Sequence, residues 1–293
     1  MIDHQHWVFL VPVTLFIVDN SIRLISILVV PRNRTPSSGT AWLLFILLAP
    51  IPGIILFWLI GGTRMPRRRR ERQFRAIELM SDIAERDAQQ FGSDLGTLPL
   101  GLGNAEKLGL ALGAQPMFRG NHATVSHISE DSLSLMATEI RAASTFVHIE
   151  FYILSYDDST HDVFDAIREA TSRGVTVRVM LDHIATMRQP RPSDTTRKLD
   201  AVGAEWTYML PVRPWRGQWQ RPDLRNHRKI LVVDGVVGFI GSQNMVDSSY
   251  NKRGNIRRGL QWRDIMVRLT GPSVSSLNRV FMSDWYQDCL LYT

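Results

Sequence analysis

Two long apolar stretches fill most of the first sixty residues, at positions 7–30 and 41–60. Each is close to the length at which an apolar helix crosses a bilayer, which takes about 20 residues. The segment between them, PRNRTPSSGT, is short and rich in Pro, Ser and Gly, so the two spans are expected to form a tight hairpin with both ends on one side of the membrane. Although 44% of all residues are hydrophobic, their concentration in this region predicts an anchored protein.

An arginine-rich segment, RMPRRRRERQFR, follows the second apolar stretch directly and supplies a large part of the formal net charge of +6. It is much denser in basic residues than the loop between the stretches, so the positive-inside bias places it on the cytoplasmic face. It also attracts anionic lipid headgroups, by roughly 1 kcal/mol per basic residue. A plain topology signal and a nucleic-acid patch are the alternatives, and the neighbouring span favours lipid over nucleic acid.

Other features exclude some classes of protein. The leader MIDHQH lacks Lys and Arg, whereas a signal peptide carries positive charge before its apolar core, so the first stretch is expected to be retained. Asp19, Asn20 and Arg23 interrupt that stretch, and the sequence assigns them no role. Cys289 is the one cysteine, which excludes an internal disulfide framework and a multi-cysteine zinc site.

The region after the arginine cluster divides into a helix, a linker and a folded domain. FRAIELMSDIAERDAQQ predicts a charged, partly amphipathic helix that leaves the membrane, and FGSDLGTLPLGLGN predicts a Gly/Pro-rich linker. We therefore expect an anchor of two transmembrane helices at 1–65, a basic juxtamembrane helix with its linker at 66–105, and one domain at 106–293.

Strand-like and helix-like segments alternate beyond residue 105. STFVHIEFYIL and GVTVRVMLD predict strands, whereas HDVFDAIREATSR and TTRKLDAVGA predict helices. Gly174 directly after the first of these helices fits the left-handed conformation that often ends a helix. The alternation predicts an α/β sandwich, with a mixed, largely parallel sheet covered by helices.

The segment NHRKILVVDGVVGFIGSQN, residues 226–244, places polar groups on both sides of a β-like run. Residues 229–233 are strand-like, Asp234-Gly235 is a strong turn signal, and 236–240 resumes as a strand, which predicts a hairpin. Side chains alternate across a strand, so His227 and Lys229 point to the same face if the extended conformation reaches back to His227. Asp234 lies an odd number of residues from His227 and in the turn, so we expect a structural carboxylate there.

Ser242 and Asn244 begin where the second strand ends, which brings a hydroxyl and an amide towards His227 and Lys229. This set suits a phosphodiester, because the lysine neutralises non-bridging oxygens, the amide and hydroxyl orient them, and the histidine takes part in the covalent step. The chemistry requires no metal or other cofactor, and the neighbouring sequence lacks a carboxylate cluster that would hold a metal.

These residues resemble the phospholipase D superfamily, whose signature is His-x-Lys-x4-Asp followed after six residues by Gly-Ser-x-Asn. The positions that match it are His227, Lys229, Asp234, Gly241, Ser242 and Asn244. The N-terminal segment RNRTPSSGTAWLLFILLAPIPGIILFWLIGG also resembles the double-span anchor of bacterial cardiolipin synthases. The likeness runs from Trp7 to Trp285, and it makes residues 106–293 a single phospholipase D-like half-domain.

The resemblance implies a role for each motif residue. His227 is then the nucleophile or its acid/base partner, Lys229 and Asn244 bind phosphate, and Ser242 helps to orient the site. Asp234 belongs to the same motif and is counted with the catalytic residues on that ground. Asp264, in WRD, resembles the carboxylate that hydrogen-bonds the motif histidine and fixes its tautomer; a surface aspartate at a strand end is the alternative.

Three further residues that resemble family positions, Glu150, Tyr152 and Asp182, are interpreted as framework. The sequence contains one copy of the motif, whereas bacterial cardiolipin synthases generally carry two. Displacement at phosphorus needs an attacking group and a leaving-group acid on opposite sides, which one histidine cannot supply. A twofold homodimer or a second motif-bearing chain would complete the site, and a truncated product is the remaining alternative.

The favoured function is a membrane phosphatidyltransferase that joins two phosphatidylglycerol molecules into cardiolipin and glycerol through a phosphatidyl-histidine. The alternatives are a phospholipase D-type hydrolase and an inactive half that only binds lipid or a partner chain. RPWRGQWQRPDLRNHRK mixes aromatic and basic residues, as nucleic-acid sites do. We favour a membrane-facing loop with Trp215 and Trp219 at the interface, and expect no nucleic-acid partner.

Overall fold

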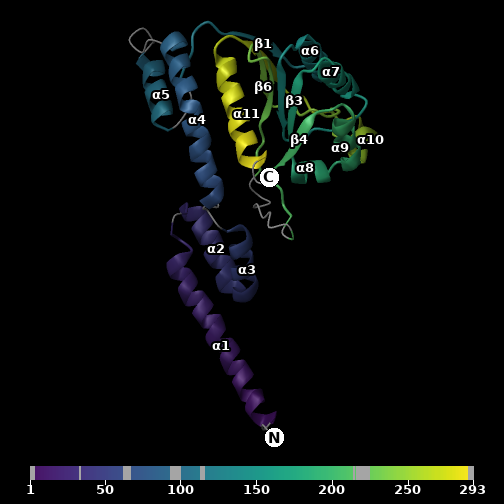
Figure 1. Ribbon diagram of the computed structural model, residues 1–293. Helices are drawn as coiled ribbons and strands as arrows, with labels where there is room; N and C mark the ends of the chain where they lie inside the picture. Colours follow the sequence, from purple (N-terminus) through teal and green to yellow (C-terminus); the bar gives the residue numbers. More distant parts are fainter. Residues whose placement is uncertain are drawn as a thin grey trace. The chain divides into compact units, whose positions relative to one another are not determined.

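The computed structural model describes residues 4–32, 34–61, 67–92, 100–112, 116–213, 215 and 225–289 (Figure 1). These residues form two compact units, one before the arginine cluster and one from Arg67 onward. Trp219 of the predicted membrane-facing loop lies outside the described residues, and Trp215 is largely exposed.

The first unit contains three helices: α1 (His4–Val29), α2 (Pro36–Leu48) and α3 (Pro50–Ile60). Residues Leu10–Val29 of α1 are long and apolar enough to cross a membrane, and α1 is the one such helix in the described part of the chain. Within it, Arg23 pairs with Asp19 one turn away at 2.9 Å, and the Asn20 amide donates to the Phe16 carbonyl at 2.8 Å. These contacts lower the cost of placing polar groups in an apolar helix.

The predicted second span is wrong as a single helix, because it is divided at Ala49 into α2 and α3. Pro50 and Pro52 follow the break, and proline lacks the N–H that would continue a helical ladder. At about 1.5 Å per residue, neither helix alone covers a hydrocarbon core of about 30 Å. The two helices pack closely, since a Cβ on Gly53 would lie 2.8 Å from Ile46 Cα.

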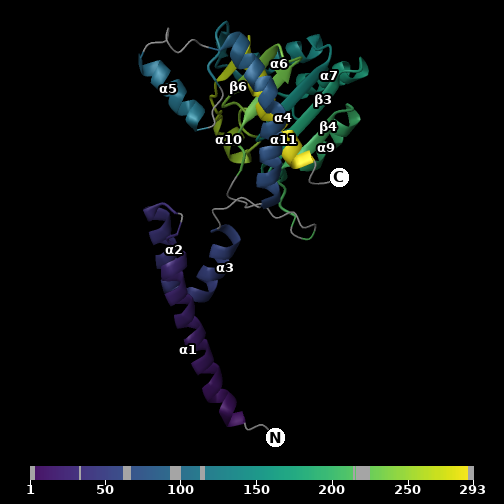
Figure 2. The same cartoon turned by 60° about the vertical axis from the view of Figure 1, so that its left-hand side comes forward.

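The second unit opens with α4 (Arg67–Phe91) and α5 (Leu100–Ala111). The predicted juxtamembrane helix is therefore present and longer than expected. The predicted linker is helical from Leu100 onward, and its residues 93–99 lie outside the described ranges. Figures 1 and 2 show α4 beside α11 (Ser273–Cys289), where the Asp87 carboxylate accepts a hydrogen bond from Ser275 Oγ at 2.5 Å and pairs with Arg279.

A seven-stranded sheet forms the centre of this unit, in the order β1-β7-β6-β5-β2-β3-β4. Its strands are β1 (His122–Ser126), β2 (Phe146–Phe151), β3 (Thr176–Asp182), β4 (Glu205–Met209), β5 (Lys229–Val233), β6 (Val237–Gly241) and β7 (Met266–Thr270). Only the β2-β3 and β3-β4 pairs are parallel, and the other four pairs are antiparallel.

The sheet is therefore mixed, as predicted, but not largely parallel. Helical crossovers connect β2 to β3 and β3 to β4, which gives parallel neighbours. A hairpin instead connects β5 to β6, and a three-residue turn, Asp234 to Val236, closes it, with Asp234 at φ 51° and Gly235 at φ 70°. Positive φ at these two residues matches the right-handed twist of the paired strands, so the predicted hairpin is confirmed.

Helices cover both faces of the sheet. One face carries α6 (Ser129–Ala142) and α7 (His161–Ser172), and the other carries α11 (Figure 2). The short helices α8 (His183–Met187), α9 (Pro192–Ala201) and α10 (Arg253–Arg258) lie in the connections. Alternation along β2 sends Ile149 and Phe151 into the core under α6 and α7, whereas His148 stacks on Phe281 of α11. Burial of each such side chain contributes about 1.5–3 kcal/mol.

Candidate active site

Two strands end and two strands begin next to one another at one end of the sheet, seen along the strand direction. We call this end of the strands the site edge. Strand β5 is antiparallel to both β2 and β6, and β7 is antiparallel to β6. The ends of β2 and β6 therefore lie beside the beginnings of β5 and β7, with Phe151 opposite Lys229 and Gly241 opposite Met266. The polar residues just beyond these ends are thereby brought together from distant parts of the chain.

His227 lies two residues before β5, with its side chain exposed at the site edge. Its imidazole stacks on the ring of Tyr152, with ring centroids 3.9 Å apart and an angle of 17° between the planes. Partial burial and then the nearby charge of Lys229 lower the pKa of His227 below its ordinary value. The imidazole is therefore neutral at pH 7, with a nitrogen lone pair free to act as a nucleophile or base.

Lys229 is the first residue of β5, and its side chain is buried. Its ammonium donates to the His227 carbonyl at 2.5 Å and lies 5.4 Å from the centre of the Tyr152 ring. Burial lowers the pKa of Lys229, and the carboxylate of Asp264 opposes that effect. The predicted neighbourhood of His227 and Lys229 is thus formed, with Tyr152 in contact with both.

The Gly-Ser-x-Asn segment connects the ends of β2, β6 and β7. The Asn244 carbonyl oxygen accepts from the Ile153 backbone N–H at 3.1 Å, and its amide donates to the Tyr250 hydroxyl at 2.9 Å. Ser242 Oγ accepts from the Ile265 backbone N–H at 3.0 Å. These contacts leave one Asn244 N–H and the Ser242 hydroxyl hydrogen available to a ligand.

Gly241 is required by the close approach of two backbones. A Cβ at this position would lie 2.1 Å from the Ile265 carbonyl oxygen, closer than any side chain permits. The glycine of the motif therefore acts through packing, because it lets the end of β6 lie against the residues that lead into β7.

Asp264 lies at the site edge but not in the contact that the resemblance implies. Its charge partly offsets the burial that lowers the pKa of Lys229, and it adds to the burial that raises the pKa of Tyr250. Among the described residues, however, no hydrogen bond joins Asp264 to His227. The structure thus places this carboxylate as a counter-charge to the lysine.

Asp234 does not lie with the other motif residues. It is in the turn at the opposite end of β5, where its carboxylate accepts from the backbone N–H groups of Ser144, Thr145 and Phe146, each at 2.8 Å. Burial raises the pKa of Asp234, but these hydrogen bonds outweigh it and hold the pKa below its usual value. Its inclusion among the catalytic residues is at odds with this position, which is that of a carboxylate fixing the start of β2.

Buried carboxylates bind the residues on either side of His227. The sequence indicated only some of these carboxylates. Asp182 pairs with Arg225 at 2.8 Å, and both side chains are almost fully buried. On the α11 side of the sheet, the Asn226 amide donates to Glu150 at 2.8 Å and to Asp284 at 3.0 Å. We call these five residues the histidine support.

The electrostatics of the histidine support favour one neutral carboxyl. Burial, and then the charge of Asp284, raises the pKa of Glu150 well above its usual value, which favours the neutral acid over the carboxylate. Asp284 also pairs with Arg228, which follows His227. A carboxylate inside an otherwise apolar strand was the sequence signal for Glu150 and Asp182, whereas nothing local in the sequence marked Arg225, Asn226 or Asp284.

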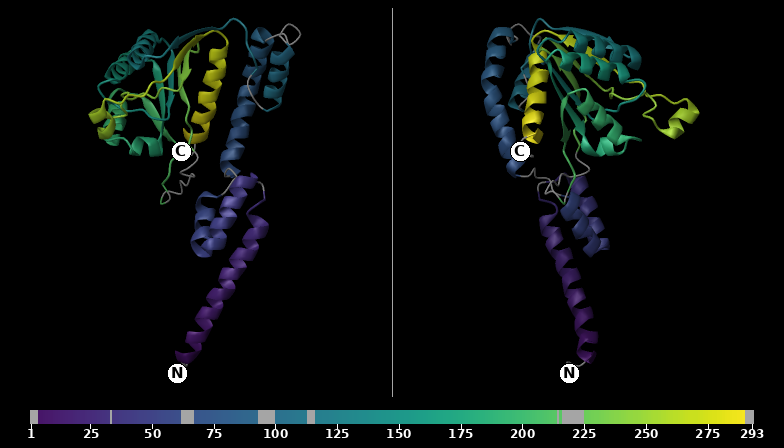
Figure 3. Two further views of the ribbon diagram at one scale, coloured as in Figure 1. Left: turned by 180° about the vertical axis from the view of Figure 1, so that it is seen from behind. Right: turned by 45° about the vertical axis from the view of Figure 1, so that its right-hand side comes forward.

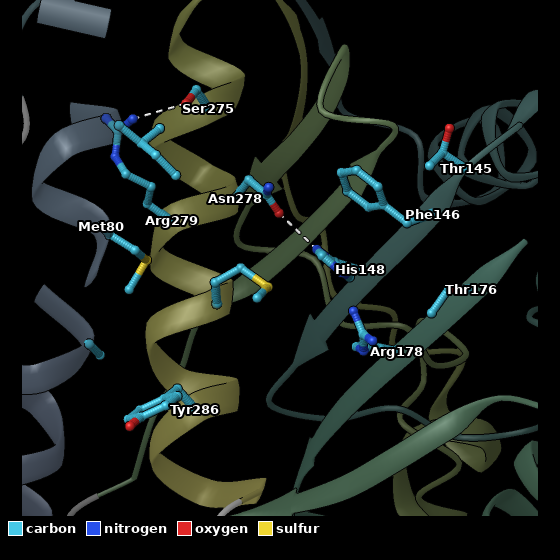
Figure 4. A pocket seen from close by; sticks show the side chains of 13 residues that line it. Met80, Thr145, Phe146, His148, Thr176, Arg178, Ser275, Asn278, Arg279 and Tyr286 are labelled. Carbon is cyan, nitrogen blue, oxygen red and sulfur yellow. Dashed lines mark hydrogen bonds between the residues drawn. The ribbon is translucent and has the colours of Figure 1, made fainter. Parts of the chain in front are cut away.

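A cavity of about 460 Å³ lies away from the site edge, between α4, α11 and the beginnings of β2 and β3 (Figure 4). Its lining is mostly apolar and includes Met80, Phe146 and Met282. His148 also lines it and contacts Asn278 through Nδ1 at 2.7 Å (Figure 4). None of the motif residues contributes to its lining, so it is separate from the candidate site.

Comparisons with known proteins identify the family of the chain. The family described as "Cardiolipin synthase, PLD-like domain" matches residues 136–285. Cardiolipin synthase A of Proteus mirabilis is 30% identical over 265 residues, covering 88% of this chain and 52% of that protein. Cardiolipin synthase of Alkalihalophilus pseudofirmus is 26% identical over 274 residues, covering 91% and 52%.

The chain thus spans about half the length of the curated relatives it matches. Among solved structures, NucT from Helicobacter pylori aligns with 58% of this chain and 98% of that protein at a TM-score of 0.44 and 13% identity, which is too low to support a functional comparison. The family match begins within α6 and ends within α11, and it includes every motif residue at the site edge. On this ground, the chain belongs to the cardiolipin synthase family of phospholipase D-like domains.

Proposed function

We propose that the chain is a membrane phosphatidyltransferase of the cardiolipin synthase type, with His227 as its nucleophile. Phosphatidylglycerol donates its phosphatidyl group to His227, and a second phosphatidylglycerol accepts it to give cardiolipin. Free glycerol is the other product. The observation that supports this most directly is the exposed, neutral imidazole of His227 beside the buried ammonium of Lys229.

In the first step, a ring nitrogen of His227 attacks the lipid phosphorus as the bond to the glycerol headgroup oxygen breaks, and that oxygen takes a proton. In the second step, a hydroxyl of the acceptor lipid attacks phosphorus, loses its proton, and breaks the phosphorus–nitrogen bond. Lys229 neutralises a non-bridging oxygen in both steps, and Asn244 and Ser242 orient the phosphate. Tyr152 and the histidine support fix the position of the imidazole.

A second acid/base group is needed, because His227 cannot lie on both sides of the phosphorus. We propose that it comes from outside residues 1–293, from a second copy of the chain or from another motif-bearing segment. Hydrolysis is the competing reaction, because the exposed His227 is also accessible to water. The arginine cluster favours a cytoplasmic position for residues 106–293, which we propose as one phospholipase D-like half-domain.

The purified chain in phosphatidylglycerol liposomes tests this function. We expect cardiolipin and glycerol in equal amounts, at a rate per chain that rises with surface density if a second copy completes the site. His227→Ala should abolish both products, whereas His122→Ala, a change at an exposed histidine of edge strand β1, should leave them unchanged. Cardiolipin formed equally by the His227→Ala variant would exclude the assigned nucleophile.

A further inference from the structure

The loop formed by residues 252–263, which we call the arginine loop, combines exposed cations with exposed apolar side chains. It includes α10, and it stands away from the sheet in the right-hand view of Figure 3. Ile256, Leu260 and Trp262 have exposed fractions of 59%, 47% and 58%. No residue of α10 is buried, so these side chains do not contribute to the core.

Within the described part of the chain, the cations of the arginine loop have no acidic partners. The loop contains five basic residues and no Asp or Glu: Lys252, Arg253, Arg257, Arg258 and Arg263. All five are exposed, and none forms an ion pair with any residue in the described ranges. Their positive charge is therefore available to an external anionic surface.

The loop is held in place at its base. The Asn255 side-chain amide donates to the Ser249 carbonyl, and the backbone N–H of Trp262 donates to the Ser248 carbonyl, both at 2.9 Å. The Asn251 amide donates to the Asp157 carboxylate at 2.9 Å. Because these contacts fix both ends of the loop, its apolar side chains are presented to solvent by a defined structure.

The loop is also connected to the site edge. Trp262 packs edge-on against Tyr250, with ring centroids 5.8 Å apart. The Tyr250 hydroxyl in turn accepts the hydrogen bond from Asn244. Trp262 and Tyr250 therefore connect a surface that binds the loop to Asn244, which is proposed to bind the phosphate.

We propose that the arginine loop docks on an anionic lipid bilayer, with Ile256, Leu260 and Trp262 in the interface and the five cations among the headgroups. Apolar side chains flanked by basic residues bind such surfaces through both burial and charge, and tryptophan is favoured at the depth of the headgroups. This contact would be additional to the N-terminal anchor. It does not depend on the chemistry of His227.

Charge excludes the two other occupants. A second copy meeting this surface across a twofold axis would place five cations against five cations, and like charges in contact oppose association. Nucleic acid would use the arginines but would leave the aliphatic Ile256 and Leu260 without a partner, because base and phosphate contacts are polar or aromatic. Only a lipid surface uses both kinds of side chain.

Site-specific fluorescence in the full-length chain tests the docking. A Leu260→Cys variant in a Cys289→Ser, His227→Ala background carries an environment-sensitive fluorophore and is placed in nanodiscs of phosphatidylcholine with or without phosphatidylglycerol. The matched control carries the fluorophore at Val236→Cys, a position 63% exposed in the turn at the opposite end of β5. We expect blue-shifted emission and quenching by spin-labelled lipid at position 260 only, and only with phosphatidylglycerol.

The charge contribution is measured in the same nanodiscs. Arg257→Gln with Arg258→Gln should lower the ratio of docked to undocked loop by about fivefold per removed cation. Equal quenching at 260 and 236, or none at 260, would overturn the proposal. Quenching that is independent of phosphatidylglycerol would overturn the proposal that the bilayer surface must be anionic. A fluorophore at position 260 that is already shielded in detergent would show that the loop contacts protein instead of lipid. Because the background lacks His227, failure here leaves the proposed reaction untouched.

Discussion

The ring of Tyr152 stacks on the imidazole of His227 with centroids 3.9 Å apart, and the same ring lies 5.4 Å from the ammonium of Lys229. One aromatic residue at the end of β2 thus contacts the two groups that open β5. The stack restricts the rotation of the exposed imidazole, and the electron-rich face of the Tyr152 ring attracts the nearby ammonium. Tyr152 is accordingly a positioning residue for the proposed nucleophile.

Tyr152→Phe should retain most of the cardiolipin synthesis, because the stacked ring remains. Tyr152→Leu should lower kcat by about 10- to 100-fold, since small displacements of a reacting group have effects of this size. Steady-state kinetics on both variants measures this. Near-UV circular dichroism serves as the control for folding, and equal losses in the two variants would show that the hydroxyl, rather than the ring, is what matters.

The two buried carboxyls at positions 182 and 150 should respond differently to neutralisation. Asp182→Asn leaves the buried Arg225 without its counter-charge, so we expect a loss of about 3–5 kcal/mol in the free energy of unfolding. Glu150→Gln should cost less than about 1 kcal/mol, because burial already favours the neutral form of Glu150 and the amide oxygen still accepts from Asn226. Denaturant unfolding in detergent at pH 7 distinguishes the two variants, and a larger loss for Glu150→Gln than for Asp182→Asn would contradict this prediction.

The stability of the α/β unit should depend on pH through His148. Burial lowers the pKa of His148 to about 4, below its ordinary value of 6.5. Between these values the unfolded chain binds a proton that the folded chain does not, so stability is full above pH 6.5 and falls as the pH decreases towards 4. The loss is up to about 3 kcal/mol.

The control for this prediction is His148→Gln, which cannot ionise and can still donate to Asn278. Its unfolding free energy should change less between pH 6.5 and pH 4 than that of the unchanged chain. Parallel pH profiles for the two proteins would show that His148 does not titrate in this range.

Two glycines of the anchor unit provide a matched pair. A Cβ on Gly53 would lie 2.8 Å from Ile46 Cα, whereas on Gly39 the nearest atom, Pro31 Cα, would be 3.7 Å away. Gly53→Ala should therefore destabilise the packing of α2 on α3 by about 1–3 kcal/mol, and Gly39→Ala should be tolerated. Limited proteolysis of the reconstituted chain measures this, and equal resistance of both variants would contradict a close α2–α3 contact.

Patterns that are local in sequence predicted the fold well. The β5–β6 hairpin, helix α7 and the cap at Gly174, with φ 85°, all depend on neighbouring residues and were expected within one or two positions. Strand order depends on long-range pairing, so the antiparallel contact of β2 with β5 was missed. The break at Ala49 was missed because hydropathy alone does not register what Pro50 and Pro52 do to a helical ladder.

The candidate site divides in the same way. Side-chain alternation predicted His227 and Lys229 as neighbours, and both lie at the ring of Tyr152 although β5 begins only at Lys229. Arg225, Asn226 and Asp284 act through partners on other elements, and no spacing rule reveals such partners from one sequence. For Asp234 the two lines of reasoning differed: its turn position predicted a structural carboxylate, which agrees with its backbone hydrogen bonds, whereas the motif alone counted it as catalytic.

In the proposed reaction His227 takes the phosphatidyl group onto a ring nitrogen. A phosphatidyl ester of p-nitrophenol isolates this step, because that leaving group departs without an acid and so does not require a second half-site. We predict a burst of p-nitrophenolate stoichiometric with the chain, and a phosphatidyl adduct on the peptide that contains His227. No burst, or the same adduct yield in a His227→Asn variant, would show that His227 is not the nucleophile.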